Sequence, residues 1–157
     1  MSSRFVYVTY IRTTPEKLWE ALLKPEFTRQ YWFGVTLASD WKVGSKWSMS
    51  YSDDTVTDSG EVLESRPPER LVLSWRNAFP EMEPEGYTRC TFDISRAGQE
   101  TKLQVVHEID MDNSKTIASV SNGWPMVLSG LKTLLETGAN LNIPRRSATE
   151  SDRRRSA

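Results

Sequence analysis

The feature that most constrains this chain is an apolar stripe near its C-terminal end. Trp124, Leu128, Leu131 and Leu135 recur at i, i+4, i+7 and i+11, a spacing that places them on one face of a helix. Gly138 follows the stripe and can adopt the left-handed conformation that ends helices. A stripe this broad needs a matching apolar surface, so the fold must cover one long side of this helix.

The residues between 35 and 108 supply that surface as β-strands. Two stretches place apolar residues on alternate positions, as half-buried strands do. Their inward residues are Trp47, Met49 and Tyr51 in the first stretch and Leu71, Leu73 and Trp75 in the second. Residues 66–69, Arg-Pro-Pro-Glu, form a rigid turn, so the strand over 58–65 and the strand over 71–75 should pair antiparallel.

A second hairpin is expected around residues 96–99. Pairing Ser95 with Glu100 places the apolar residues of both strands on one face, as burial requires. This register sets Ile94 opposite Thr101, Phe92 opposite Leu103, Cys90 opposite Val105 and Thr88 opposite His107. Cys90 and His107 then face the same way as the apolar residues and lie diagonally across from each other.

The N-terminal part predicts a strand over residues 4–12, followed by two short helices. Phe5, Tyr7, Thr9 and Ile11 share one face of the strand. Thr14 can cap the first helix and Pro15 suits its first position, where a missing N–H costs nothing. The buried side of this helix is expected to consist of Leu18, Ala21 and Leu22. Pro25 ends it and can start a second helix over residues 25–32.

Pro125 is the irregular position of the C-terminal helix. A proline inside a helix removes one N–H and collides with the preceding turn. The sequence therefore predicts either a kink at Pro125 or a late helix start at Gly123, with residues 114–122 as a separate turn. Of the two, we favour the kinked helix.

Composition excludes several classes of site. One Cys cannot form an internal disulfide, and one His beside it cannot make a structural zinc site, so neither a metal nor a cofactor is expected. The sequence has no Gly-rich phosphate loop and no Gly-x-Ser-x-Gly elbow. No apolar run approaches the roughly 18 to 20 residues that span a bilayer, and the first strand leaves no room for a signal peptide. We expect a cytoplasmic protein without membrane insertion.

Charge is distributed unevenly along the chain. The formal net charge is −1, yet residues 139–157 hold five Arg against two acids, so residues 1–138 are net acidic. An acidic body argues against nucleic acid as the main partner. We expect one folded domain over residues 1–138 and a basic, disordered tail over residues 139–157, because the tail has no apolar residues to bury after Ile143 except one alanine near its middle and one at its end.

Three ordered motifs carry a resemblance to a known family. They are residues 14–26, the turn Pro67-Pro68-Glu69-Arg70-Leu71 with Trp75 after it, and Gly123-Trp124 ahead of Leu128 and Leu131. Together they resemble the activator-of-Hsp90-ATPase homologue family of the START-like, or polyketide cyclase-like, superfamily, over about residues 4–138. The resemblance implies an α+β helix-grip fold. In that fold a curved antiparallel sheet of six or seven strands wraps around a long C-terminal helix, and two short helices follow the first strand.

Such a fold favours a mostly apolar pocket between sheet and helix. We expect it to bind a small hydrophobic or aromatic molecule without catalysis, with the polar loop over residues 77–86 at its mouth. The candidate ligand-binding residues are Trp47, Met49, Tyr51, Leu73, Trp75, Cys90, Phe92, Leu103, His107, Trp124, Leu128 and Leu131. The alternative is that these side chains meet and fill the core.

Two other functions follow from the resemblance. One is a co-chaperone that binds an Hsp90-type chaperone and stimulates its ATPase, although the eukaryotic activator uses a separate N-terminal domain for much of that contact. The other is a cyclase or aromatase activity, with His107 and either Tyr51 or Thr88 as acid and base. The sequence also permits a reactive Cys90–His107 pair. The alternative is that His107 is hydrogen-bonded and has no catalytic role. Both a monomer and a homodimer are compatible with the sequence.

Overall fold

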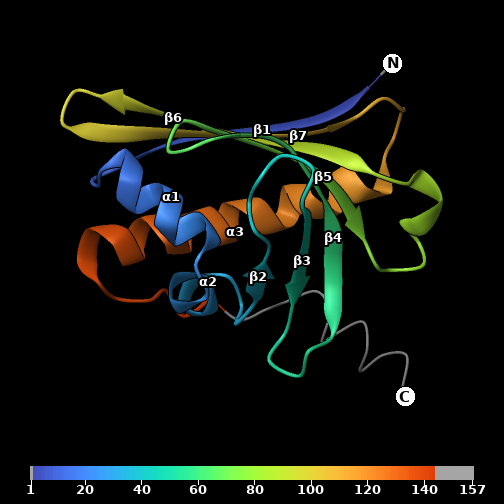
Figure 1. Cartoon of the computed structure of the whole chain (residues 1–157), viewed down its shortest axis with the longest axis horizontal. Coiled ribbons are helices and arrows are strands. Elements are labelled where there is room, and N and C mark those ends of the chain that lie inside the picture. The colour runs from blue at the N-terminus through green and yellow to red at the C-terminus, as the bar shows by residue number, and fades with distance from the viewer. Residues whose placement is uncertain (1, 144–157) are drawn as a thin grey trace.

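The computed structural model describes residues 2–143, and within them seven strands form one antiparallel sheet in the order β1-β7-β6-β5-β4-β3-β2. Figure 1 shows the sheet curving around α3, with α1 and α2 on the same side. This is the predicted helix-grip arrangement, with seven strands. The strands are β1 Ser3–Ile11, β2 Thr36–Ala38, β3 Lys46–Ser50, β4 Val56–Arg66, β5 Arg70–Asn77, β6 Thr88–Ala97 and β7 Glu100–Ile109. The helices are α1 Pro15–Leu23, α2 Pro25–Tyr31, the 3-10 turn η1 Glu83–Glu85 and α3 Lys115–Thr137.

The start of α1 follows the predicted chemistry. The Thr14 hydroxyl accepts a hydrogen bond from the Lys17 N–H at 3.2 Å, and Pro15 occupies the first turn. The predicted apolar side is buried. Helix α2 starts at Pro25 as predicted, and its Tyr31 hydroxyl donates to the Ala21 carbonyl at 2.7 Å, which fixes the two helices against each other.

The hairpin of β4 and β5 forms at the predicted Pro-Pro turn, and the Pro67–Pro68 peptide bond is cis. Six residues before the end of β4, a glycine allows an indole to cross this strand. Gly60 pairs with Trp47, whose indole N–H donates to the Ser74 carbonyl at 2.9 Å. A Cβ on Gly60 would lie 1.9 Å from that carbonyl oxygen, so only glycine leaves room for the two strands and the ring.

The register predicted for the β6–β7 hairpin is wrong by two residues. Ala97, not Ser95, pairs with Glu100, and the turn shrinks to Gly98 and Gln99, where Gly98 has φ +66°. Two-residue turns with a left-handed glycine match the twist of paired strands better than the four-residue turn that we expected. A shift of two preserves the faces of both strands, so the inward residues are still those predicted. The observed pairs are Ile94 with Leu103, Phe92 with Val105 and Cys90 with His107.

Helix α3 begins at Lys115, eight residues before Gly123, so the alternative of a late start with a separate turn over residues 114–122 is wrong. Ser114 is its N-cap and accepts from the Ile117 N–H at 3.1 Å. The helix continues through Pro125 and ends at Gly138, which has φ +76° and donates its N–H to the Leu134 carbonyl. A kink at Pro125 stays a prediction.

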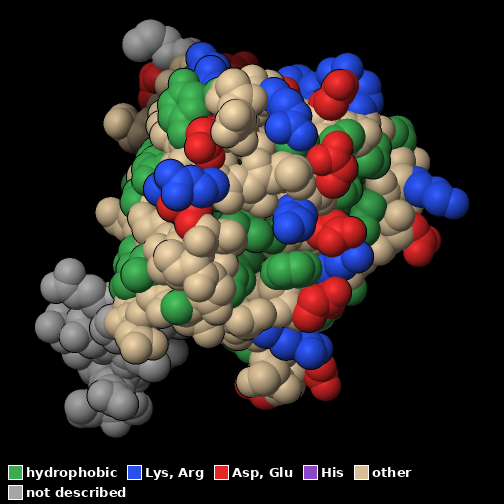
Figure 2. Space-filling model, turned by 90° about the vertical axis from the view of Figure 1, so that its left-hand side faces the viewer, with side chains coloured by type: hydrophobic (Ala, Val, Ile, Leu, Met, Phe, Trp, Pro, Cys, Tyr) green, Lys and Arg blue, Asp and Glu red, His purple; other side chains and the backbone are tan. Residues whose placement is uncertain are grey.

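Residues 139–143 follow α3 without regular secondary structure, and the rest of the predicted tail lies outside the described residues. Within residues 2–143 no helix is long and apolar enough to cross a membrane. On the face shown in Figure 2, Lys and Arg side chains are interspersed with Asp and Glu, and neither sign gathers into a patch.

Candidate functional site

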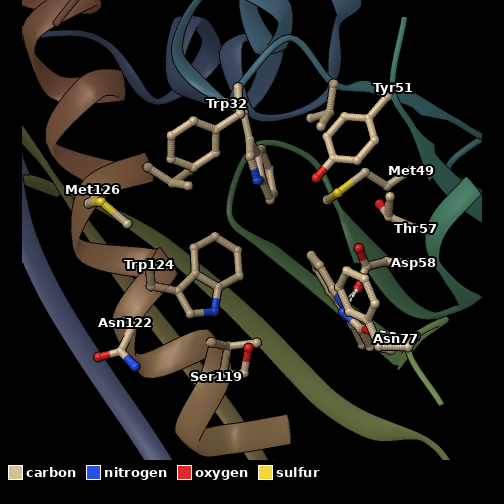
Figure 3. Close-up of a pocket in the computed structure, with 17 residues that line it drawn as sticks. Trp32, Met49, Tyr51, Thr57, Asp58, Asn77, Ser119, Asn122, Trp124 and Met126 are labelled. Carbon is tan, nitrogen blue, oxygen red and sulfur yellow. Dashed lines mark hydrogen bonds between the residues drawn. The ribbon is translucent and has the colours of Figure 1, made fainter. Parts of the chain in front are cut away.

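A cavity of about 640 Å³ lies between the N-terminal half of α3 and strands β3 to β5 (Figure 3). Its aromatic lining consists of Trp32, Phe33, Tyr51, Trp75, Phe79 and Trp124. Its aliphatic lining consists of Val35, Met49, Val120, Met126 and Val127. Its polar lining consists of Thr57, Asp58, Asn77, Ser119 and Asn122, and Gly123 completes the wall. The cavity therefore has an apolar body, with polar residues contributed by β4, β5 and α3.

A β-bulge in β4 supplies two of the polar lining residues. Met49 pairs with Asp58 but Ser50 pairs with Val56, so Thr57 is an extra residue in β4. Side chains of successive strand residues normally point to opposite faces, yet Thr57 and Asp58 are both buried and both line the cavity. The bulge thus turns two neighbouring polar side chains into the same space.

Asp58 is the carboxylic acid of the cavity, and two donors hold it. Its Oδ1 accepts from the Trp75 indole N–H at 2.9 Å and from the Asn77 amide at 3.0 Å. Burial raises the pKa of Asp58, and these hydrogen bonds oppose that shift. The neighbouring Thr57 hydroxyl is buried, makes no hydrogen bond of good geometry within residues 2–143, and lies close enough to Asp58 to lower the pKa of that carboxyl.

His107 lies behind Trp124 and takes part in a chain of hydrogen bonds that runs to the Trp75 carbonyl. The Trp124 indole can only donate, so His107 Nδ1 accepts its N–H at 3.1 Å and Nε2 carries the imidazole proton. Nε2 lies 2.7 Å from the Thr88 hydroxyl, which in turn donates to the Trp75 carbonyl at 2.8 Å. Burial lowers the pKa of His107 to about 3, so the ring is neutral at pH 7. The chain fixes the orientation of Trp124.

The end of α2 forms the third side of the cavity. Phe33 and Gly34 both have left-handed backbone, with φ of 50° and 77°. This sharp turn brings Trp32, Phe33 and Val35 to the same opening. The ring centroids of Trp32 and Trp124 are 5.3 Å apart, so the helices meet there through their aromatic rings.

The loop between β5 and β6 borders the cavity, as predicted, through Asn77 and Phe79. Its last part is tied to α3 by Glu85. Glu85 Oε1 accepts from the Ser114 hydroxyl at 2.6 Å, and Oε2 accepts from the Lys115 N–H at 2.7 Å. Burial raises the pKa of Glu85, but these bonds and those from Thr116 lower it more, to about 2.

The structure divides the twelve residues predicted from the sequence into two groups. Four of them line the cavity, namely Met49, Tyr51, Trp75 and Trp124. The other eight are packed in the buried core around it, namely Trp47, Leu73, Cys90, Phe92, Leu103, His107, Leu128 and Leu131. Cys90 is fully buried beside His107, and burial raises the pKa of its thiol. The ring nitrogens of His107 are occupied by Trp124 and Thr88, so neither is left to activate that thiol.

Sequence reasoning missed the polar part of the site. Thr57 and Asp58 were not predicted as lining residues, because strand faces were assigned by alternation and the bulge interrupts that alternation. Ser119, Asn122 and Gly123 were not predicted because the helix residues were chosen from the apolar stripe, which begins at Trp124. Within residues 2–143 no group of three or more His, Cys, Asp or Glu side chains could hold a metal ion.

Comparison with known proteins gives the chain its family. The model of the family "Activator of Hsp90 ATPase homolog 1-like protein" matches residues 12–136. A search of curated proteins gives no match.

Similar solved structures share the fold. A Cytophaga hutchinsonii protein is 27% identical with a TM-score of 0.65, covering 85% of this chain and 93% of its own. A Mesorhizobium loti protein is 24% identical with a TM-score of 0.71, covering 85% and 96%. The Aha1 dimer from Colwellia psychrerythraea is 19% identical with a TM-score of 0.71, covering 87% and 98%. With the family model matching most of its length, this chain belongs to the activator of Hsp90 ATPase homolog 1-like family.

Proposed function

We propose that this protein binds a small, mostly apolar molecule in the cavity between α3 and the sheet, without catalysing a reaction. The observation that carries the proposal is the cavity itself, about 640 Å³ in volume, in which eleven of the seventeen lining residues are apolar and six of these are aromatic. Pockets of roughly 300 to 1,000 Å³ with such walls are typical sites for small ligands.

The walls of the cavity are built in advance of any ligand. Trp75 and Trp124 donate their indole N–H groups to Asp58 and His107, and their ring centroids are 5.8 Å apart. Gly123 leaves space in the wall of the cavity, because a Cβ there would meet no atom within 4 Å. Large rings that are fixed by hydrogen bonds lose little entropy when a ligand binds.

Binding is favoured over catalysis because the cavity is poor in reactive groups. Among its lining residues only Asp58 and Tyr51 can titrate. A cyclase or aromatase would need His107 with Tyr51 or Thr88, yet His107 and Thr88 bond to each other outside the lining. Burial also holds the pKa of His107 at about 3, too low for a useful base near neutral pH.

A fluorescent probe can test this proposal. N-phenyl-1-naphthylamine is neutral at pH 7 and brightens in apolar pockets, so it should give saturable fluorescence with the wild type. Gly123→Leu places a side chain in the cavity and should abolish this signal, whereas Gly123→Ala should retain it. Equal fluorescence with Gly123→Leu and wild type would overturn the proposal, and so would no signal with the wild type.

Family membership favours a second candidate, co-chaperone activity. A family named for activation of the Hsp90 ATPase suggests that this chain stimulates an Hsp90-type chaperone. The test is the ATPase rate of an Hsp90-type chaperone with and without the protein. If the cavity and this activity are independent, Gly123→Leu should stimulate as the wild type does. No stimulation by the wild type at saturating concentrations would reject this candidate.

A further inference from the structure

We propose that the cavity selects apolar molecules that carry a protonated amine, with Asp58 as the counter-ion and Thr57 as a second acceptor. This inference rests on the proposed ligand-binding function and adds the chemical class of the ligand. Three independent observations carry it: the charge of the lining, the direction of two polar side chains, and the position of three indole rings.

The charge of the lining is one-sided. Asp58 is 8% exposed, and no Lys, Arg or His belongs to the lining. Burial has the largest influence on the pKa of the Asp58 carboxyl, and no charged group within residues 2–143 offsets it. A buried carboxylate without a cation is unfavourable, and a ligand ammonium group would remove that cost. For the same reason an anionic ligand would be repelled.

The direction of the polar side chains fits an ammonium group. Figure 3 shows Thr57, Asp58 and Asn77 on one wall, facing Trp124 across the cavity. The Trp75 and Asn77 donors hold Asp58 as a hydrogen-bond acceptor. The buried Thr57 hydroxyl lies beside the Asp58 carboxyl, and its oxygen lone pairs can still accept a bond from a ligand. An ammonium group carries three N–H donors and can satisfy both acceptors at once.

The indole rings add attraction for a cation beside the carboxylate. Trp32, Trp75 and Trp124 all line the cavity, and the centroids of Trp32 and Trp75 are 6.3 Å apart in a stacked arrangement. The face of an indole attracts cations, most strongly where water is excluded. The same rings also supply the apolar surface for the body of the ligand. A neutral alcohol could bond to Asp58 but would gain neither the charge pairing nor this attraction.

Two probes of the same shape test the inference. They are 2-naphthylmethylamine, which is protonated at pH 7, and 2-naphthalenemethanol, which is neutral. We expect calorimetric titration of the wild type to give an amine dissociation constant about tenfold lower than that of the alcohol. In Asp58→Asn, whose amide oxygen can still accept from Trp75 and Asn77, the two probes should bind with similar affinity. Gly123→Leu should bind neither.

The outcomes separate this inference from the proposal on which it rests. Similar affinity of amine and alcohol for the wild type, with both lost in Gly123→Leu, would overturn the amine preference and leave the binding cavity intact. An amine preference that persists in Asp58→Asn would also overturn it, because the cation would then pair elsewhere. Binding of neither probe to the wild type would overturn both proposals. Because amine and alcohol are compared on the wild type itself, the test does not depend on whether Asp58→Asn folds.

Discussion

Two glycines in α3 mark two different kinds of interface along one helix. At Gly130 a Cβ would lie 3.2 Å from the Tyr31 carbonyl oxygen, because α2 packs directly on the helix there. At Gly123, seven residues earlier and on nearly the same face, a Cβ would meet nothing within 4 Å. The same helix is therefore closely packed towards its C-terminal end and faces a cavity towards its N-terminal end.

Side-chain chemistry explains the difference between the two ends. The packed end presents Leu128, Leu131 and Leu134, all buried. The hollow end presents Ser119, Asn122 and Gly123 among its apolar residues, and polar or absent side chains do not fill a core. The fold thus places a packed interface at one end of the helix and a cavity at the other, and substitutions at the two ends should have different consequences.

The largest effect is expected from Leu131→Ala at the packed end. Leu131 is fully buried, so its truncation should leave a closed void and lower the free energy of unfolding by about 3 kcal/mol. Met126→Ala, at the hollow end, only enlarges an existing space and should cost less than about 1 kcal/mol. Urea unfolding at pH 7 measures both values. Equal losses would mean that the two ends are equally well packed.

The next effect compares a large side chain at the two glycines. Gly130→Leu should force α2 away from α3 and lower the free energy of unfolding by about 2 kcal/mol through overpacking. Gly123→Leu should leave stability unchanged or raise it, since leucine is the better helix former, while it removes probe binding. Thermal unfolding together with probe titration distinguishes the two results. A Gly123→Leu protein as unstable as Gly130→Leu would refute the division of the helix.

The sequence predicted the packed end better than the hollow one. Helical periodicity, which depends only on local sequence, placed Leu128 and Leu131 of the packed end on the buried face. The two-residue error in the β6–β7 register left the inward faces unchanged, because strand faces repeat every second residue. Burial, which drives these patterns, therefore made the core predictable.

The cavity could not be predicted in the same way. Asp58 lines it because of an irregular pairing between β3 and β4, and hydrophobic alternation carries no signal for a bulge. His107 was a candidate because its chemistry is versatile, yet its neighbours Trp124 and Thr88 use both ring nitrogens. Whether large side chains fill a space or surround it depends on distances between elements far apart in sequence.

A smaller effect is expected at Glu85, which ties the loop beside the cavity to the start of α3. Because the folded pKa, about 2, lies below the ordinary value of 4.5, Glu85 stabilises the fold fully above pH 4.5. That contribution is lost as the pH falls from 4.5 through 2. Glu85→Gln should lower the free energy of unfolding by about 1 kcal/mol at pH 7. This is the usual effect of losing a helix cap, because solvent screens this partly exposed group.

The control for Glu85→Gln is pH itself. The difference in free energy of unfolding between variant and wild type should be constant from pH 5 to pH 7 and should shrink as the pH approaches 2. Urea unfolding across that range gives the measurement. A difference that does not change with pH would show that the carboxylate charge adds nothing to the contacts with Ser114 and Lys115.

The smallest effect comes from adding a single methyl group at each glycine. Gly123→Ala should stabilise the protein by about 0.5 to 1 kcal/mol, because alanine is the better helix former and its methyl group meets open space. Gly130→Ala gains the same propensity but presses on Tyr31, whose Cβ would lie 3.3 Å from the new atom, so the gain should be cancelled. Because helix propensity is equal in the two variants, the difference in their unfolding free energies isolates the packing of α3. If both alanine variants were stabilised equally, α2 would yield to the methyl group and the packed end would be looser than its contacts indicate.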